Sequence, residues 1–86
     1  MAKQGEISPY ERELVQMLEE SLQREKQTQE YYRKAAEKAG LNPETKAMFE
    51  LLAAEEEAHV EMIQGRLTEN RRRLAAIEWS HLGIKE

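Results

Sequence analysis

The chain has 86 residues, no cysteine and a formal net charge of −4, from 17 acidic and 13 basic residues. This length allows one small domain, and without cysteine no disulfide, zinc finger or thiolate-held cluster can stabilise it. Because the acidic and basic residues are interleaved, the charge also excludes the basic surface of a protein that binds nucleic acid or an anionic membrane.

A first long helix is predicted over residues 9–39. Ser8 suits the N-cap, Pro9 suits the first helical position, and Glu11 completes a capping box. No helix-breaking residue follows until Gly40, and the segment consists mainly of residues that favour helix. Gly40 is a natural C-terminal stop, so we expect the helix to end just before it.

A second long helix is predicted over residues 43–68, and a shorter third helix over residues 71–82. Asn42 is a good N-cap for the second helix, and Pro43 is a good first residue. Gly65 lies inside this helix and weakens it by up to about 1 kcal/mol. We expect the second helix to continue past Gly65 to about Leu67 or beyond.

The turn between the two long helices has about three residues, so the helices must fold back on each other antiparallel. A chain of this size buries only about 60–65% of its unfolded surface, and a two-helix hairpin leaves much of its apolar surface exposed. Two hairpins would cover that surface by pairing into a four-helix bundle. We therefore predict an all-α fold, a hairpin plus a short C-terminal helix that dimerises, with residues 1–86 forming a single half domain.

Both long helices carry polar residues in the middle of their apolar faces. Glu25 lies near the centre of this face on the first helix, and Glu56 and His59 lie on that of the second. At 1.5 Å per residue all three lie about 20–24 Å from the turn, so antiparallel packing brings them to one height. Burying such groups without a partner costs several kcal/mol, and a bound cation would remove that cost.

The segment Glu56-Glu57-Ala58-His59 has the spacing Glu-x-x-His, which places its first and last side chains on one face of a helix. Together with a Glu from a neighbouring helix, this is half of the ligand set of carboxylate-bridged di-iron bundles. Carboxylates with one imidazole per metal suit iron or manganese. Glu-x-x-His often occurs by chance on a charged helix, but the matched position of Glu25 favours a metal site.

Several short patterns resemble one half of a rubrerythrin or ferritin-like domain, and the resemblance covers roughly residues 14–83. They are Glu25 with Tyr32 seven residues later, then Ala35-Ala36, Phe49 and the segment Leu51-Leu52-Ala53-Ala54-Glu55-Glu56-Glu57-Ala58-His59. The chain resembles in particular the encapsulated ferritins. These short members of the ferritin-like superfamily also have Pro-Glu at the start of the second helix and a Trp in a third helix, like Trp79 here.

This resemblance implies a ferroxidase that oxidises Fe(II) to Fe(III) at a di-iron centre shared between two subunits. Glu25, Glu56 and His59 would be the metal ligands and catalytic residues, with Tyr32 beside them. The implied partners are further copies of the chain, as a dimer that forms the site and a ring of dimers such as a decamer. An encapsulin shell protein would enclose the oligomer in a cytoplasmic nanocompartment that stores the oxidised iron.

No nucleic acid or membrane partner is expected. No apolar run approaches the roughly 20 residues of a membrane span, and the N-terminal residues Met1-Ala2-Lys3-Gln4-Gly5 are polar and lack the core of a signal peptide. These features favour a soluble, cytoplasmic chain.

Two other classes of function stay open. A rubrerythrin-type peroxide-reducing or metal-binding protein would use the same ligands, although the chain has no cysteine pairs for electron delivery. A metal-free helical-hairpin oligomer would need none of them. The resemblance also leaves the route by which iron reaches the site open. Encapsulated ferritins have further acids flanking the first ligand, whereas this chain has Arg24, Gln27 and Thr28 near those positions.

Overall fold

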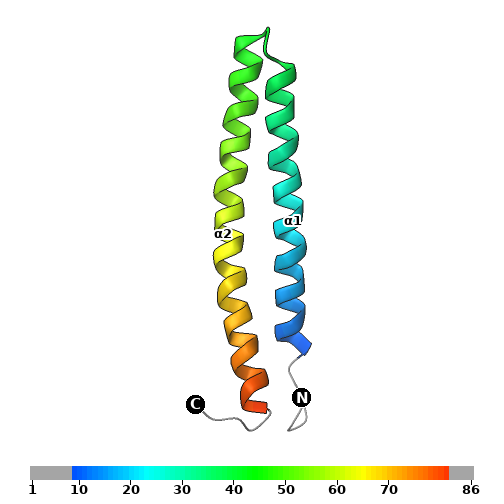
Figure 1. Cartoon of the computed structure of the whole chain (residues 1–86), viewed down its shortest axis with the longest axis vertical. Coiled ribbons are helices and arrows are strands. Elements are labelled where there is room, and N and C mark those ends of the chain that lie inside the picture. Colours follow the sequence, from blue (N-terminus) through cyan, green and yellow to red (C-terminus); the bar gives the residue numbers. More distant parts are fainter. Residues whose placement is uncertain (1–8, 82–86) are drawn as a thin grey trace.

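A computed structural model describes residues 9–81, which form two long α-helices (Figure 1). Helix α1 runs over Pro9–Lys38 and helix α2 over Pro43–His81. The two helices lie side by side and antiparallel along their length, joined by a short turn (Figure 1). The predicted all-α hairpin is therefore confirmed, whereas the predicted N-cap Ser8 lies outside the described residues.

The turn is closed by hydrogen bonds around Asn42. The Gly40 amide donates to the carbonyl of Glu37 at 3.2 Å, and the Asn42 amide donates to the carbonyl of Ala39 at 2.8 Å. The amide of Thr45 donates to Oδ1 of Asn42 at 3.1 Å. This bond satisfies one of the free N–H groups at the start of α2, as expected of an N-cap. A turn this short fixes which residues of the two helices lie at the same height.

The prediction of a separate third helix over residues 71–82 is wrong, because α2 continues from Pro43 to His81. Gly65 does not end the helix: it is exposed, and a Cβ added there would meet nothing within 4 Å. Glycine costs about 1 kcal/mol at this position because its helix propensity is low, but it keeps the backbone N–H that the helix needs. Burial offsets this cost, since Leu67 is only 1% exposed and Leu74 packs against the same core.

The helices pack along a seam in which buried positions recur every seven residues. On α1 the buried residues are Val15, Leu22, Gln29 and Ala36. On α2 the same repeat holds Ala53, Val60, Leu67 and Leu74, which are buried or half-buried. A seven-residue repeat on both helices is the pattern of a left-handed coiled coil. The seam is therefore continuous along the hairpin, although its composition changes from one end to the other.

Three ion pairs join the two helices near the open end of the hairpin. They are Arg71 with Glu19 at 2.8 Å, Arg73 with Glu11 at 3.5 Å, and Arg12 with Glu78 at 3.5 Å. The arginine side chains are more than half exposed, so each pair contributes about 0–1 kcal/mol. The pairs align the C-terminal part of α2 with the start of α1.

The hairpin is one helix thick. It measures 62 × 25 × 14 Å, and its radius of gyration is 19.2 Å, against about 12 Å for a compact domain of this length. Within the described residues, neither helix is long and apolar enough to cross a membrane. A shape this extended leaves two broad faces of the hairpin without any covering layer.

The two broad faces differ in character. At 100° per residue from the seam, one face carries exposed Met17, Tyr31, Met48 and Met62, with Arg24 and Glu55 at the intervening positions. We call it the apolar face. The opposite face carries charged and amide side chains, and we call it the polar face. Its members at seven-residue spacing are Arg12, Glu19, Lys26 and Arg33 on α1, and Glu50, Glu57 and Gln64 on α2. The two faces thus differ in how many exposed apolar side chains they carry.

Candidate metal centre

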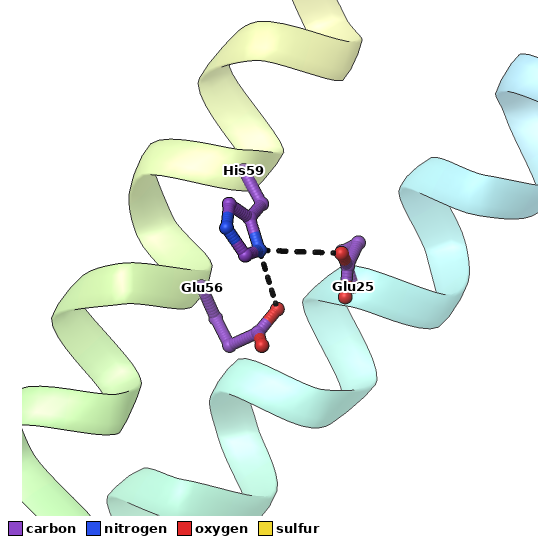
Figure 2. A group of neighbouring side chains, drawn as sticks. All are labelled: Glu25, Glu56 and His59. Carbon is purple, nitrogen blue, oxygen red and sulfur yellow. Dashed lines mark ion pairs between the residues drawn. The ribbon is translucent and has the colours of Figure 1, made fainter.

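Glu25 of α1 meets Glu56 and His59 of α2 part-way along the seam (Figure 2). The Nδ1 atom of His59 lies 3.4 Å from Oε1 of Glu25 and 3.5 Å from Oε2 of Glu56. One potential ligand atom from each residue lies within 4.8 Å of the other two. The structure therefore brings all three predicted ligands into one group.

Local structure explains why these three residues meet. Glu56 and His59 are three residues apart on α2, so their side chains leave the helix on neighbouring positions of one face. The short turn sets Glu25 at their height on α1. Two nearby acids lie elsewhere: Glu55 is exposed, and the exposed carboxylate of Glu30 pairs with Arg33 at 3.9 Å. Of the acids in these two segments, Glu25 and Glu56 therefore belong to the group, whereas Glu30 and Glu55 do not.

The three side chains are buried to different degrees. The side chain of Glu56 is 15% exposed, that of Glu25 29% and that of His59 49%. The imidazole of His59 reaches the apolar face of the hairpin, because it lies about 70° from the middle of the seam on that side. The site therefore has an inner carboxylate and an outer, accessible imidazole.

The carboxyl group of Glu56 is in an unfavourable setting without a cation. Its Oε2 atom is buried and has no hydrogen-bond partner. A hydrogen bond with the Glu25 carboxyl, burial and the negative charge of Glu25 raise the pKa of Glu56 above 4.5, and His59 acts in the opposite direction. Without a cation, the carboxyl group of Glu56 is therefore harder to ionise than that of an exposed glutamate.

The residues present fit a divalent metal ion. Two donor atoms that each lie about 2.1 Å from one ion are about 3.0–3.4 Å apart, close to the 3.4 and 3.5 Å found around His59. An ion would also give the buried Oε2 atom of Glu56 the partner that it lacks. Two carboxylates and one imidazole suit iron, manganese or zinc. Three protein donors leave further positions for water, substrate or donors from another chain.

Tyr32 lies one heptad after Glu25, on the side of the site nearer the turn. Its ring stacks on that of Phe49, with centroids 6.2 Å apart, and meets the ring of Tyr31 edge-on at 5.6 Å. Its hydroxyl does not bond to Oε2 of Glu56, which has no hydrogen-bond partner. Tyr32 thus contributes an aromatic layer between the site and the turn, and its assignment as a partner of the ligands stays a prediction.

Two further features beside the site were not assigned a role from the sequence. Gln29, one helical turn after Glu25, is only 8% exposed. A groove of about 500 Å³ lies next to it between the helices, on the polar face, and it includes Ala53 and Glu57. Gln29 could have been noticed, because it is the polar member of an otherwise apolar seven-residue repeat. The groove depends on which residues oppose each other across the seam, and no local pattern shows that.

The comparison with protein families agrees with this geometry. The model of the ferritin-like domain matches residues 13–81, a range that includes both helices and all three members of the Glu-Glu-His group. Neither the curated proteins nor the solved structures gave a significant match. Because the family model covers most of its length, the chain belongs to the ferritin-like domain family.

Proposed function

We propose that this protein is a ferroxidase, with Fe(II) as its substrate and O₂ as its oxidant. One observation carries the proposal: a ferritin-like domain brings Glu25, Glu56 and His59 together around a buried carboxylate oxygen that has no hydrogen-bond partner. In the overall reaction four Fe(II) ions each lose one electron. One O₂ accepts these four electrons together with four protons and forms two water molecules.

The residues of the group have distinct parts in this proposal. The carboxylates of Glu25 and Glu56 bind Fe(II) and favour its oxidation, because their attraction for the ion grows with the charge of the ion. His59 contributes a neutral nitrogen donor from the accessible side of the site. Substrate binding also requires the carboxyl group of Glu56 to be ionised, since a ligand must be deprotonated to bind a metal.

The proposal includes a di-iron site shared between two subunits. One hairpin supplies two carboxylates and one imidazole, which is half of the ligand set of a di-iron bundle. The half-exposed His59 reaches the same face as the exposed side chains of Met17, Tyr31 and Met62. A two-fold contact through that face would repeat the same residues on both sides. It would bring two Glu-Glu-His groups together and cover the apolar side chains.

The larger assembly in this proposal is a ring of dimers, such as a decamer, inside a cytoplasmic encapsulin nanocompartment that stores the oxidised iron. These parts depend on the resemblance to encapsulated ferritins alone. Light scattering of the purified protein measures the number of subunits. Co-expression with an encapsulin shell protein, followed by isolation of the shells, tests whether the chain is enclosed. A monomer or dimer that stays outside the shells would contradict this part.

Addition of Fe(II) without oxygen, followed by air, tests the activity. We expect oxygen uptake and ferric absorbance to rise faster than in buffer, with about four Fe(II) oxidised per O₂. Glu56→Gln should abolish the acceleration, because it keeps the shape of the side chain but removes its charge. Glu30→Gln, the control, should leave it unchanged. Iron binding without acceleration would instead favour a metal-binding or peroxide-reducing protein, and no binding would favour a structural oligomer.

A further inference from the structure

We propose that Fe(II) reaches its ligands through the groove on the polar face, with the side-chain amide of Gln29 at the inner end of this route. The proposal depends on the proposed function, because it takes the apolar face to be covered by a second copy of the chain. It goes beyond that function by assigning a role to residues that do not bind the metal in the final site.

The groove exists because small residues line the seam beside the site. Ala36 and Ala53 are buried and contribute to its lining, and Ala54 lies at its rim. Alanine at these positions leaves a space between the helices that a larger side chain would fill. Ala53 precedes Glu56 by one helical turn, and Glu57, which also lines the groove, follows Glu56 directly. The groove is therefore lined by sequence neighbours of Glu56, the most buried ligand, while the three ligands themselves do not line it.

Gln29 is the residue of the groove lining that lies nearest to Glu25 along α1. Gln29 is only 8% exposed and lines the groove. Its side chain makes no hydrogen bond with the protein within residues 9–81. It is four residues after Glu25, so the two side chains lie on one face of α1. A Leu at this position of the repeat would stabilise the seam better than an amide. An amide oxygen is, however, a good transient ligand for a hydrated divalent cation.

The charges around the groove favour a cation. Glu37, Glu50 and Glu57 line it together with Lys46 and Arg33. The guanidinium of Arg33 pairs with Glu30 at 3.9 Å, and Glu30 does not line the groove. The lining thus holds three carboxylates and two cationic groups, and a groove with an excess of one charge concentrates ions of the opposite charge.

The arrangement of the two faces explains why such a route is needed. In a single hairpin His59 is open to water on the apolar face. A second copy packed on that face would close this approach and would leave the polar face in contact with solvent. The groove on the polar face, beside Glu56, the least exposed ligand, would then remain open to solvent.

Stopped-flow uptake of Co(II), followed by its visible absorbance, tests the route in the full-length protein. Ala54→Leu narrows the rim of the groove. Ala47→Leu is the matched control, because both alanines are exposed on α2 and lie seven residues apart, but Ala47 does not line the groove. We expect Ala54→Leu to slow both uptake and release about tenfold, with an unchanged dissociation constant. A narrower route raises the barrier for entering and leaving alike, and Ala47→Leu should change neither rate.

Charge reversal is a second experiment, which tests the charge of the groove instead of its width. The double variant Glu50→Lys and Glu57→Lys should slow Co(II) uptake about tenfold or more at low salt, and the difference from wild type should shrink at high salt, because salt screens exposed charges. Glu61→Lys on the same helix is the control, since Glu61 is exposed and does not line the groove.

Gln29→Leu separates a role in ion passage from a structural role. The proposal expects a higher melting temperature together with slower Co(II) uptake. A structural role alone would lower the melting temperature and leave the uptake rate of the folded protein unchanged.

The outcomes distinguish the route from the proposed function. If Ala54→Leu, the double charge reversal and Gln29→Leu all take up Co(II) at the wild-type rate and to the wild-type extent, the route is wrong while the metal site stands. If the wild-type protein binds no Co(II) at equilibrium, both the site and the route are wrong. Slower uptake in the groove variants, with normal rates in both controls, supports the route.

Discussion

In the half of the seam near the open end of the hairpin, Val15, Leu22 and Leu67 form an apolar cluster. In the half near the turn, the same repeat holds Gln29, Ala36 and Ala53, and the adjoining positions hold two carboxylates and an imidazole. The same seven-residue repeat thus buries large apolar side chains in one half. In the other half it holds small and polar side chains. The comparison indicates that the open end supplies stability and that the half nearer the turn supplies the site.

Replacing a large side chain in the apolar half should have the greatest effect. Leu67→Ala removes the most buried side chain of the described residues, and we expect it to lower the free energy of unfolding by about 2–5 kcal/mol. In so small a chain, this loss should unfold the metal-free protein at ordinary temperature. Thermal unfolding followed by circular dichroism measures it.

Thr68→Ala is the control for Leu67→Ala. Its hydroxyl is exposed and donates only to the carbonyl of Gln64 in the same helix, at 3.0 Å, so stability should change by less than about 0.5 kcal/mol. An equal loss of stability in the two variants would contradict the role of the apolar half of the seam in stabilising the fold.

Replacing the ligands should weaken metal binding and leave the stability of the metal-free protein largely unchanged. Glu25→Gln, Glu56→Gln and His59→Ala should each weaken divalent-metal binding by at least about a hundredfold, while the metal-free helices remain folded. Isothermal titration with Mn(II) or Co(II) gives the affinity, and circular dichroism gives the helix content. Glu30→Gln should bind like wild type. If it were as damaging as Glu56→Gln, the carboxylate of Glu30 would have to bind the metal, which would contradict its exposed position on α1.

Metal binding should also promote association of hairpins. A metal that binds the dimer and not the monomer favours the dimer by about 2.7 kcal/mol when its free concentration is 100 times its dissociation constant. Mn(II) should therefore raise the associated fraction of dilute protein, and a chelator should lower it. Sedimentation velocity at several protein concentrations measures this, with His59→Ala as the control. Full-strength binding to an isolated monomer would exclude a site shared between subunits.

The sequence predicted the hairpin well because local chemistry determines it. Pro9 starts α1 as predicted, and the turn around Gly40 and Asn42 is confirmed by its hydrogen bonds. Once the turn is short, the heights of Glu25 and Glu56 follow from the rise of a helix. The grouping of candidate ligands was therefore accessible from residue spacing alone.

The features that the sequence analysis missed depend on contacts across the seam. Gly65 weakens α2 locally, but the burial of Leu67 against α1 outweighs it, and only the paired structure shows that. Ala53 is an ordinary helix former by sequence, yet in the structure it leaves the space that becomes a groove. Tertiary packing often overrides propensity in this way.

The smallest expected effect concerns pH in the metal-free protein. The hydrogen bond with Glu25, burial and the charge of Glu25 raise the pKa of Glu56 above 4.5 in the fold. A group with a raised pKa binds its proton more tightly in the folded state. It therefore stabilises the fold fully below its ordinary pKa, and this contribution is lost as the pH rises through the raised value.

Melting temperatures measured with a chelator between about pH 4 and 7 test this linkage. Across this range the melting temperature of the wild type should fall relative to that of Glu56→Gln, which carries no titrating group at this position. Mn(II) should reverse the trend in the wild type, because the metal binds the ionised carboxylate and so stabilises the fold more as the pH rises. If the two proteins keep a constant difference in melting temperature without metal, the facing carboxyl groups do not retain a proton. The buried Oε2 atom of Glu56, which has no hydrogen-bond partner, would then carry its charge in the metal-free fold. The spacing of the three ligands would remain as the feature that favours a cation at this position.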